Sequence, residues 1–164
     1  MSAIVGMGTG LPEGRLTNAD LERTLDTTDE WIIERTGIKE RRLAAEGEDA
    51  VTLATEACQG ALKDAGVSTD EIDLLIVATI TPPRRLPAAS AYVQDNLGLQ
   101  CGAFDLVAAC SGFVYSYVMA DAYIKAGHAR SVLVVGAETI SAIVDPTDRG
   151  TKILRGDGAA AAVV

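Results

Sequence analysis

The segment Ile72–Ile80 constrains the fold more than any other part of the chain. It is a nearly unbroken apolar run, rich in β-branched residues, without alternation between apolar and polar positions. A strand of this kind is buried on both faces, which happens when helices cover both sides of a mainly parallel sheet. The rest of the chain must therefore supply helices for two outer layers and further strands for the central one.

Periodicity predicts those further elements. Apolar residues between Ala50 and Ala65 form one stripe of a helix, and Gly66 is typical of the position after a helix end. The elements expected next are a helix over 88–96, a strand over 103–107, a helix over about 111–126 and a strand over 132–135. This alternation predicts an α/β fold, layered α/β/α, with a mixed, mainly parallel five-stranded sheet. The helix over 111–126 is mostly apolar all round, which predicts that it is buried.

The two ends of the chain predict the remaining strands. Ala3–Met7 is a short apolar strand that would run into a glycine-rich turn over 8–12. Near the other end, Ile153–Leu154 and Ala159–Val164 would bracket a tight turn over 156–158. Because that connection is too short for a crossover, we expect an antiparallel edge there.

Two short helices are predicted before the first long one. Thr17 would cap a helix over Asn18–Leu25, with Asp20 three residues on in a capping-box pattern. A second helical stretch, Asp29–Arg35, would end at Gly37. Both lie in the acidic N-terminal part of the chain.

Composition limits the class of protein. The length of 164 residues, 48% of them hydrophobic, fits one domain over 1–164 with a substantial core. Fourteen Lys and Arg against 23 Asp and Glu give a net charge of −9, which argues against nucleic acid as a partner. No apolar run reaches the ~20 residues that span a bilayer, and the first residues do not form a signal peptide. Three cysteines without CxxC spacing indicate a reducing, cytoplasmic location and no metal site.

Cys110 is the strongest candidate for chemistry. It lies in the small-residue segment 108–112, where a predicted strand passes into the N-terminus of an apolar helix. The helix dipole and free backbone N–H groups there favour a thiolate and could stabilise an oxyanion. The alternative is a core cysteine among alanines, since free cysteines are often buried. Cys58, on the apolar stripe of its helix, and Cys101, at a strand start, are expected to be structural.

Two other catalytic interpretations fail on geometry. His128, the single histidine, and Cys110 flank the same predicted helix, which separates them by roughly 25 Å and excludes a Cys–His hydrolase within one chain. The glycines near the N-terminus do not form a dinucleotide loop. The third glycine of GxGxxG would fall at Leu11, and Pro12 blocks a helix there.

Basic residues are few, so their grouping is informative. An aromatic ring beside arginines suits stacking on a nucleobase and pairing with phosphates. The alternative, a solvated basic segment that balances the acidic residues before it, stays open on composition alone. The basic groups are Arg35, Lys39, Arg41 and Arg42 after the only tryptophan, Trp31; Arg84 and Arg85; and Arg149, Lys152 and Arg155.

Four segments together resemble β-ketoacyl-acyl-carrier-protein synthase III, in the order that family has them. They are the run from Asp26 to Ile38, the run Ala108–Phe113 around Cys110, the run Asp145–Thr151 and the run Gly156–Ala159. The resemblance extends from end to end of the chain. It implies a thiolase-like fold and makes Cys110 the active-site nucleophile.

The resemblance also implies a reaction. Cys110 would accept the acyl group of an acyl-CoA, which would then condense with malonyl-acyl-carrier protein after decarboxylation, the step that initiates fatty acid synthesis. The CoA thioester would be a substrate, and no cofactor would be bound permanently. The basic groups would suit an acidic acyl-carrier protein as a partner, despite the net negative charge.

Six further residues correspond to binding positions of the family. Trp31 and Arg149 would sandwich the CoA adenine, and Thr27 and Arg35 would lie near the nucleotide and its phosphates. In the acyl pocket, Leu86 would line the partner subunit's cavity. Arg155, in place of a usual phenylalanine, would lie beside the active-site pocket.

The family's catalytic His and Asn lie in a second half of similar fold, so the sequence resembles the N-terminal half only. We therefore expect a half-enzyme: a truncation, an engineered or reconstructed half-domain, or one subunit of a split enzyme. Lys152 and Arg155 would place two charges on an otherwise apolar strand and so protect an edge or solubilise the chain.

Three functions stay open from the sequence. The chain could be a condensing-enzyme part that accepts an acyl group but lacks full condensation activity. It could be a non-catalytic module that self-associates as a structural homodimer through the helix after Cys110. It could also form a heteromer with a separate C-terminal half that carries the His and Asn.

Overall fold

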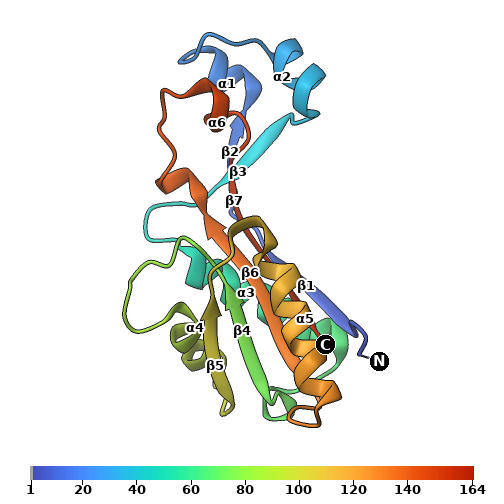
Figure 1. The fold of residues 1–164 in the computed structure, drawn as a ribbon. Helices are drawn as coiled ribbons and strands as arrows, with labels where there is room; N and C mark the ends of the chain where they lie inside the picture. The colour runs from blue at the N-terminus through green and yellow to red at the C-terminus, as the bar shows by residue number, and fades with distance from the viewer. Residues whose placement is uncertain (1) are drawn as a thin grey trace.

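The computed structural model describes residues 2–164, which build around one five-stranded sheet (Figure 1). β4 pairs in parallel with β5 and β6, whereas β7 is antiparallel to both β6 and β1. Four strands therefore run one way and β7 runs the other, which confirms the expected mixed, mainly parallel sheet. The strand order is β1 (Gly6–Gly10), β7 (Asp157–Val163), β6 (Val132–Thr139), β4 (Leu74–Ala78) and β5 (Gly102–Leu106).

Helices cover both faces of this sheet. The long helices are α3 (Ala50–Ala65), α4 (Ala89–Leu97) and α5 (Gly112–Lys125). α3 and α4 lie on one face and α5 on the other, which confirms the α/β/α layering (Figure 1).

The central strand β4 explains the two layers. Leu75 and Val77 pack into the apolar cluster on the α3 side, and Leu74 and Ile76 pack into the cluster on the α5 side. All five residues of β4 are buried. Because consecutive side chains of a strand point to opposite faces, each face of β4 needs its own helical cover.

The first strand is shifted by three residues from the expected Ala3–Met7, so it occupies part of the turn that was expected over 8–12. β1 spans Gly6–Gly10, and α3 crosses it at very short range. A Cβ atom on Gly8 would lie 2.2 Å from the carbonyl oxygen of Ala57 and 2.3 Å from the backbone nitrogen of Ala61. These glycines therefore permit close contact between strand and helix, which is the second common use of glycine besides turns.

The turn expected over 156–158 is also wrong. β7 begins at Asp157, which pairs with Thr139 of β6, and β7 lies inside the sheet between β1 and β6. The Asp157 carboxylate accepts hydrogen bonds from the backbone N–H groups of Ala44 and Ser141, both at 2.8 Å. A buried carboxylate thus anchors the strand start to two loops, where the sequence suggested a hairpin.

The residues before β7 form a helix and a loop instead of a strand. Lys152 ends the short helix α6 (Arg149–Lys152), and Arg155 is exposed in the loop that follows it. The expectation that these two charges protect the edge of an apolar strand is therefore wrong.

A smaller lobe lies beside the carboxyl ends of β4 and β6, at the top of Figure 1. A small apolar cluster of Leu21, Ile32 and Ile153 forms its centre. The lobe contains the antiparallel pair β2 (Gly14–Thr17) and β3 (Glu40–Leu43), together with α1 (Asn18–Glu22), α2 (Asp29–Thr36) and α6. The β2–β3 pair was not predicted from the sequence.

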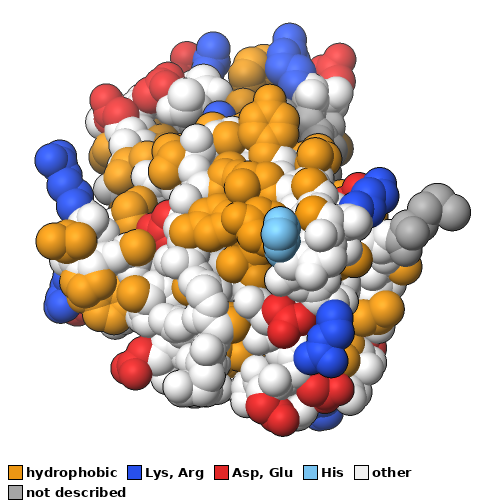
Figure 2. Space-filling view, turned by 60° about the horizontal axis from the view of Figure 1, so that its bottom comes forward, with side chains coloured by type: hydrophobic (Ala, Val, Ile, Leu, Met, Phe, Trp, Pro, Cys, Tyr) orange, Lys and Arg blue, Asp and Glu red, His pale blue; other side chains and the backbone are white. Residues whose placement is uncertain are grey.

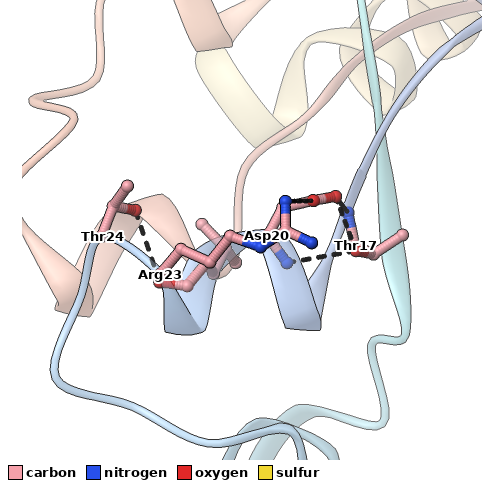
Figure 3. Close-up of polar contacts among 5 residues, drawn as sticks. Thr17, Asp20, Arg23 and Thr24 are labelled. Atoms are coloured by element: carbon pink, nitrogen blue, oxygen red, sulfur yellow. Dashed lines mark hydrogen bonds and ion pairs between the residues drawn. The ribbon is translucent and has the colours of Figure 1, made fainter.

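The predicted capping box at Thr17 is confirmed (Figure 3). The backbone N–H of Thr17 donates to the Asp20 carboxylate at 3.0 Å, and the backbone N–H of Asp20 donates to the Thr17 hydroxyl at 3.2 Å. The Thr17 hydroxyl also donates to Asp20, which lowers the pKa of that carboxyl. α1 ends at Glu22, one turn short of the predicted Leu25, and Gly37 ends α2 with a φ of 71°.

One face of α5 is exposed, so the expectation of a helix buried all round is wrong for the described chain. Gly112, Ser116 and Ala120 pack on the sheet, whereas Val114 and Val118 are 58% and 57% exposed. Figure 2 shows hydrophobic side chains gathered over this region of the surface. Nothing within residues 2–164 covers the second apolar face that the sequence encodes. Across those residues, no helix combines the length and apolar character needed to cross a membrane.

Candidate functional site

The carboxyl ends of β4, β5 and β6 meet at the edge of the sheet that faces the smaller lobe (Figure 1). Cys110 follows β5 in a single 3₁₀ turn, Ala109–Ser111, and α5 begins directly after that turn. The Cys110 side chain is exposed. Because parallel sheets place their binding sites at this edge, the position suits a reacting group.

The backbone around Cys110 has an uncommon shape. Ala109 has a φ of 45°, in the left-handed region that residues other than glycine rarely adopt. At the start of α5, a Cβ atom on Gly112 would lie 2.9 Å from the Cβ of Ala78 at the end of β4. The helix therefore begins tightly against the sheet, and the turn that presents Cys110 carries local strain of the kind found at functional sites.

The N-terminus of α5 supplies the electrostatics of this position. Ser111, the N-cap residue, makes no capping hydrogen bond with its side chain. The first backbone N–H groups of a helix favour negative charge. A thiolate on Cys110, or an oxyanion formed beside it, would lie at this positive end.

Glu138, which the sequence did not single out, forms hydrogen bonds at the same edge of the sheet. Glu138, near the end of β6, accepts hydrogen bonds from the backbone N–H of Ile80 at 2.9 Å and from the hydroxyls of Thr79 and Thr81. The Thr81 hydroxyl in turn accepts from the backbone N–H of Thr139 at 2.9 Å. The segment that follows β4 is thereby fixed to β6, close to the start of α5.

The smaller lobe brings three predicted CoA-site residues together: Trp31, Arg35 and Arg149, which we call the Trp31 clamp. The guanidinium carbon of Arg35 lies 4.5 Å from the centroid of the Trp31 ring, and that of Arg149 lies 4.7 Å from it. Both distances are within the range of cation–π contacts. Arg35 is one turn beyond Trp31 on α2, whereas Arg149 comes from the distant α6, so the fold itself assembles the clamp.

Thr27, the fourth predicted residue of the CoA site, lies just before α2. Its hydroxyl oxygen is buried and has no hydrogen-bond partner within residues 2–164. Its neighbour Asp26 holds the clamp, because the Asp26 carbonyl oxygen accepts a hydrogen bond from Arg149 Nη1 at 2.8 Å. An unpaired buried hydroxyl beside the clamp is suited to a polar ligand.

The clamp is closed in the structure. An aromatic ring inserted between Trp31 and Arg149 would need two contacts of about 3.5–4.0 Å, hence a separation of about 7 Å or more. The observed 4.7 Å leaves no such space. The expected sandwich of an adenine therefore requires Arg149 to move away from the Trp31 ring.

Comparison with known proteins shows which family the chain resembles. The family model described as 3-oxoacyl-[acyl-carrier-protein (ACP)] synthase III matches residues 104–164. The β-ketoacyl-[acyl-carrier-protein] synthase III of Rhodospirillum centenum is 54% identical over 164 residues, which are 99% of this chain and 51% of that protein. The chain matches the N-terminal half of β-ketoacyl-[acyl-carrier-protein] synthase III. It spans about half the length of the curated relatives it matches.

Solved structures show the same similarity. The 3-oxoacyl-[acyl-carrier-protein] synthase III of Aquifex aeolicus is 52% identical and superposes with a TM-score of 0.95, over 98% of this chain and 52% of that chain. The priming β-ketosynthase of the R1128 polyketide pathway superposes with a TM-score of 0.94 at 38% identity, over 98% and 48% of the two chains. The thiolase-like fold expected for the synthase III half is confirmed.

Two residues that the resemblance places in an acyl pocket lie outside the clamp and line no enclosed space within residues 2–164. Leu86 is 85% exposed in the loop that follows β4. Arg155 is exposed between α6 and β7. Neither side chain is packed into the wall of a closed pocket in the described chain, and their acyl-pocket role stays a prediction.

The other two cysteines of the chain differ from Cys110. Cys58 is fully buried, and burial raises the pKa of its thiol to about 12. Cys101 is half-buried, and loss of solvent raises the pKa of its thiol. A raised pKa lowers the thiolate fraction and therefore the reactivity, which fits the structural roles predicted for both.

His128 lies at the other end of α5 from Cys110. The 14 residues of α5, at ~1.5 Å rise per residue, separate the two by about 21 Å. This agrees with the sequence-based exclusion of an intrachain Cys–His pair. Within residues 2–164, no group of three or more His, Cys, Asp and Glu side chains is placed to hold a metal ion.

One basic residue was placed wrongly by the sequence interpretation. Arg41 was grouped with the other basic residues after Trp31, but it is only 5% exposed and contacts Ile153 and Asn18. Four residues in a row, 39–42, are charged, so no apolar neighbour in the sequence signals that one of them is buried.

Proposed function

We propose that this chain supplies the acyl-accepting half of a β-ketoacyl-acyl-carrier-protein synthase III. Cys110 takes an acyl group from acyl-CoA, and the Trp31 clamp and Thr27 bind the nucleotide of that CoA. The observation that carries the proposal is an exposed cysteine at the N-terminus of α5, on the sheet edge that faces the clamp. The roughly half-identical sequence of synthase III relatives supports the same roles.

The acyl transfer follows from the position of the thiol. The Cys110 thiol loses its proton to solvent or to the departing CoA, and its Sγ attacks the thioester carbonyl carbon. The carbonyl oxygen becomes an oxyanion, which the positive end of α5 stabilises. The bond between the carbonyl carbon and the CoA sulfur then breaks. CoA leaves as a thiol, and the acyl group stays on Cys110 as a thioester.

The nucleotide of CoA binds by displacing a protein group. Arg149 now covers the Trp31 ring, so the adenine takes the place of the guanidinium on that ring. Arg149 then lies on the outer face of the base, and Arg35 pairs with a phosphate. The Thr27 hydroxyl, which has no partner among residues 2–164, gains one from the ligand.

Condensation needs groups beyond those that surround Cys110. The one histidine of the chain lies about 21 Å away along α5. We assign the decarboxylation of malonyl-acyl-carrier protein to a complementary C-terminal half, supplied by the same polypeptide or by another. Without groups that stabilise the enolate, condensation by the chain alone should be slower by several orders of magnitude.

Acylation of Cys110 can be tested by intact-protein mass spectrometry. The chain is incubated with acetyl-CoA and is expected to gain one acetyl group, which peptide mapping locates on Cys110. The Cys110→Ala variant should gain none, whereas the matched Cys101→Ala variant should acylate like the parent. Absence of an adduct on the parent chain, or an equal adduct on Cys110→Ala, rejects the proposal.

A second measurement tests whether the Trp31 clamp binds the nucleotide of CoA. Trp31→Ala should slow acylation by acetyl-CoA at concentrations below saturation, because a stacking partner is lost. With acetyl-pantetheine, which lacks the nucleotide, Trp31→Ala and the parent chain should acylate equally. Equal slowing with both thioesters would show that Trp31 does not bind the nucleotide.

A second candidate function rests on the exposed face of α5. Val114, Tyr115 and Val118 are each more than half exposed and lie within about one turn of one another. Two copies of the chain could meet through this face about a two-fold axis, as a structural homodimer that needs no catalysis. An apolar patch of this kind is a typical association surface.

Light scattering at several dilutions tests this alternative. A dimer that Val118→Glu converts to a monomer, while Leu154→Glu in the smaller lobe leaves it intact, supports self-association through α5. A parent chain that stays monomeric at high concentration excludes it. The two functions are compatible, because a dimer could still acylate Cys110.

A further inference from the structure

A buried arginine lies in the smaller lobe, between β3, α1 and the end of α6. The Arg41 side chain, on β3, is 5% exposed. Its Nε and Nη2 both donate to the carbonyl oxygen of Ile153, at 2.8 and 2.5 Å, and its Nη1 donates to the side-chain oxygen of Asn18. Arg41 therefore joins β3 to the end of α6 and to the start of α1.

The contacts of Arg41 are unusual for a buried charge. Within residues 2–164 it forms no ion pair, and its partners are a carbonyl and an amide oxygen. Burial lowers the pKa of the guanidinium. Burying a cation without a carboxylate is costly, so a role that needs the planar, forked geometry of arginine explains its presence better than packing does.

One arm of Arg41 reaches the element that carries Arg149. Ile153 directly follows α6, whose first residue is Arg149. The loop that follows Ile153 also approaches β3, because a Cβ atom on Gly156 would lie 3.0 Å from the Cβ of Arg41. A cation that binds a carbonyl at the end of a short helix holds the helix by charge as well as by hydrogen bonds.

The other arm reaches the element that carries Trp31. Asn18 is 1% exposed, and its side-chain nitrogen donates to the Asp29 carboxylate at 2.7 Å and to the Ile38 carbonyl oxygen at 2.8 Å. Asp29 is the first residue of α2, which carries Trp31 and Arg35. The chain of contacts from Ile153 through Arg41 and Asn18 to Asp29 thus links the two sides of the clamp.

We propose that Arg41 is a positioning residue for nucleotide binding: it sets the separation of Trp31 and Arg149 through Ile153 on one side and through Asn18 and Asp29 on the other. The proposal rests on the proposed function for its ligand, the nucleotide of CoA. Its geometric part does not, because the clamp is present without a ligand. The two parts therefore need separate measurements.

The first measurement uses no ligand. Trp31 is the only tryptophan, so its emission reports the clamp alone. Arg41→Met and Arg41→Lys should raise the quenching of Trp31 by acrylamide, because Arg149 no longer stays on the ring, and Lys should have the smaller effect. The matched control is Arg42→Met on the same strand, where Nη1 donates to the Pro12 carbonyl oxygen instead of α6.

The second measurement is the affinity for adenosine 3′,5′-bisphosphate and for CoA, followed by Trp31 emission. Both Arg41 variants should bind about tenfold more weakly or worse, whereas Arg42→Met should bind like the parent. Far-UV circular dichroism and the alkylation rate of Cys110 should be unchanged, since neither depends on the clamp. Where Arg41→Met does not fold, Arg41→Lys decides.

The outcomes separate the two proposals. A parent chain that binds neither ligand contradicts the proposed function, and the quenching series still tests the position of Arg41. Arg41 variants that lose thermal stability but keep the quenching and affinities of Arg42→Met have a purely structural arginine, and the inference is overturned. Graded changes from Lys to Met in both measurements support it.

Discussion

The sheet with its helices and the smaller lobe are held together by different forces. In the sheet region, side chains such as Leu53, Leu75 and Leu133 are completely buried, and β1 lies directly against the backbone of α3. In the smaller lobe the apolar cluster is small, and the buried polar pair Arg41 and Asn18 links its elements. Apolar packing therefore builds the platform for Cys110, whereas a few directional hydrogen bonds set the Trp31 clamp.

The largest effect is expected from crowding the contact between β1 and α3. In Gly8→Ala the new methyl group would lie within 2.3 Å of two backbone atoms of α3, and backbone cannot rotate away as a side chain does. Overpacking costs typically 1–3 kcal/mol, and we expect about 3 kcal/mol or more here. Urea unfolding monitored by circular dichroism measures the loss.

Gly102→Ala is the matched control for that change. Gly102 is also a strand glycine, but the nearest atom to an added Cβ is Leu74 Cδ1, at an ordinary 3.7 Å. Because alanine restricts the unfolded chain, this variant should be neutral or slightly more stable. Equal losses in both variants would contradict the close approach of α3 to β1.

A smaller effect is expected from breaking the hydrogen bonds of Asn18, which link the elements of the smaller lobe. Asn18→Ala removes the acceptor of Arg41 Nη1 and the donor to Asp29, and it leaves these groups without partners. Unsatisfied buried groups cost about 1–3 kcal/mol each, and we expect a total loss of about 2–3 kcal/mol. Asn96→Ala, which removes an exposed amide bonded to Thr55, should cost less than about 0.5 kcal/mol.

The response should also be local. In Asn18→Ala, Trp31 emission should report unfolding of the smaller lobe at a lower urea concentration than circular dichroism reports unfolding of the sheet. A single coincident transition for both probes would show that the two regions unfold as one unit. Their different packing would then not give them different free energies of unfolding.

The same contrast explains what could be predicted from the sequence. β4 was predicted because burial on both faces leaves an unbroken apolar run, and α3 was predicted because burial of one helix face leaves a periodic apolar stripe. β1 was misplaced because glycine signals turns more often than close packing, and only α3, more than forty residues later, reveals which applies. α5 was mispredicted for a related reason: apolar residues surround this helix, so the sequence does not show which face packs on the sheet and which stays exposed.

The residues of the candidate site also fall into those that the sequence predicted and those that it missed. Cys110 was predicted from its place between a strand and an apolar helix, and the roles of Trp31 and Arg149 were predicted because their segments resemble a known family. Arg41 and Glu138 were missed because their importance lies in hydrogen bonds to residues far along the chain, Ile153 and Thr81. A charged side chain has no sequence period that distinguishes a buried brace from a solvated surface group.

The smallest effect is a pH dependence that belongs to the sheet region alone. Burial raises the pKa of Cys58 from 9.0 to about 12, so the folded chain keeps the thiol protonated where the unfolded chain ionises. Stability from this group is complete below pH 9 and falls as pH rises toward 12, by about 1.4 kcal/mol per pH unit.

Urea unfolding at about pH 8 and about pH 10 measures this loss as the difference in unfolding free energy between the parent and Cys58→Ala. Cys58→Ala should start less stable at pH 8 because of the lost side-chain volume, and the gap should narrow at pH 10 by about 1.4 kcal/mol. If the difference in unfolding free energy between the parent and Cys58→Ala stays constant with pH, solvent reaches this thiol in the folded chain. The sheet region would then not be the tightly packed part of the molecule that the comparison with the smaller lobe describes.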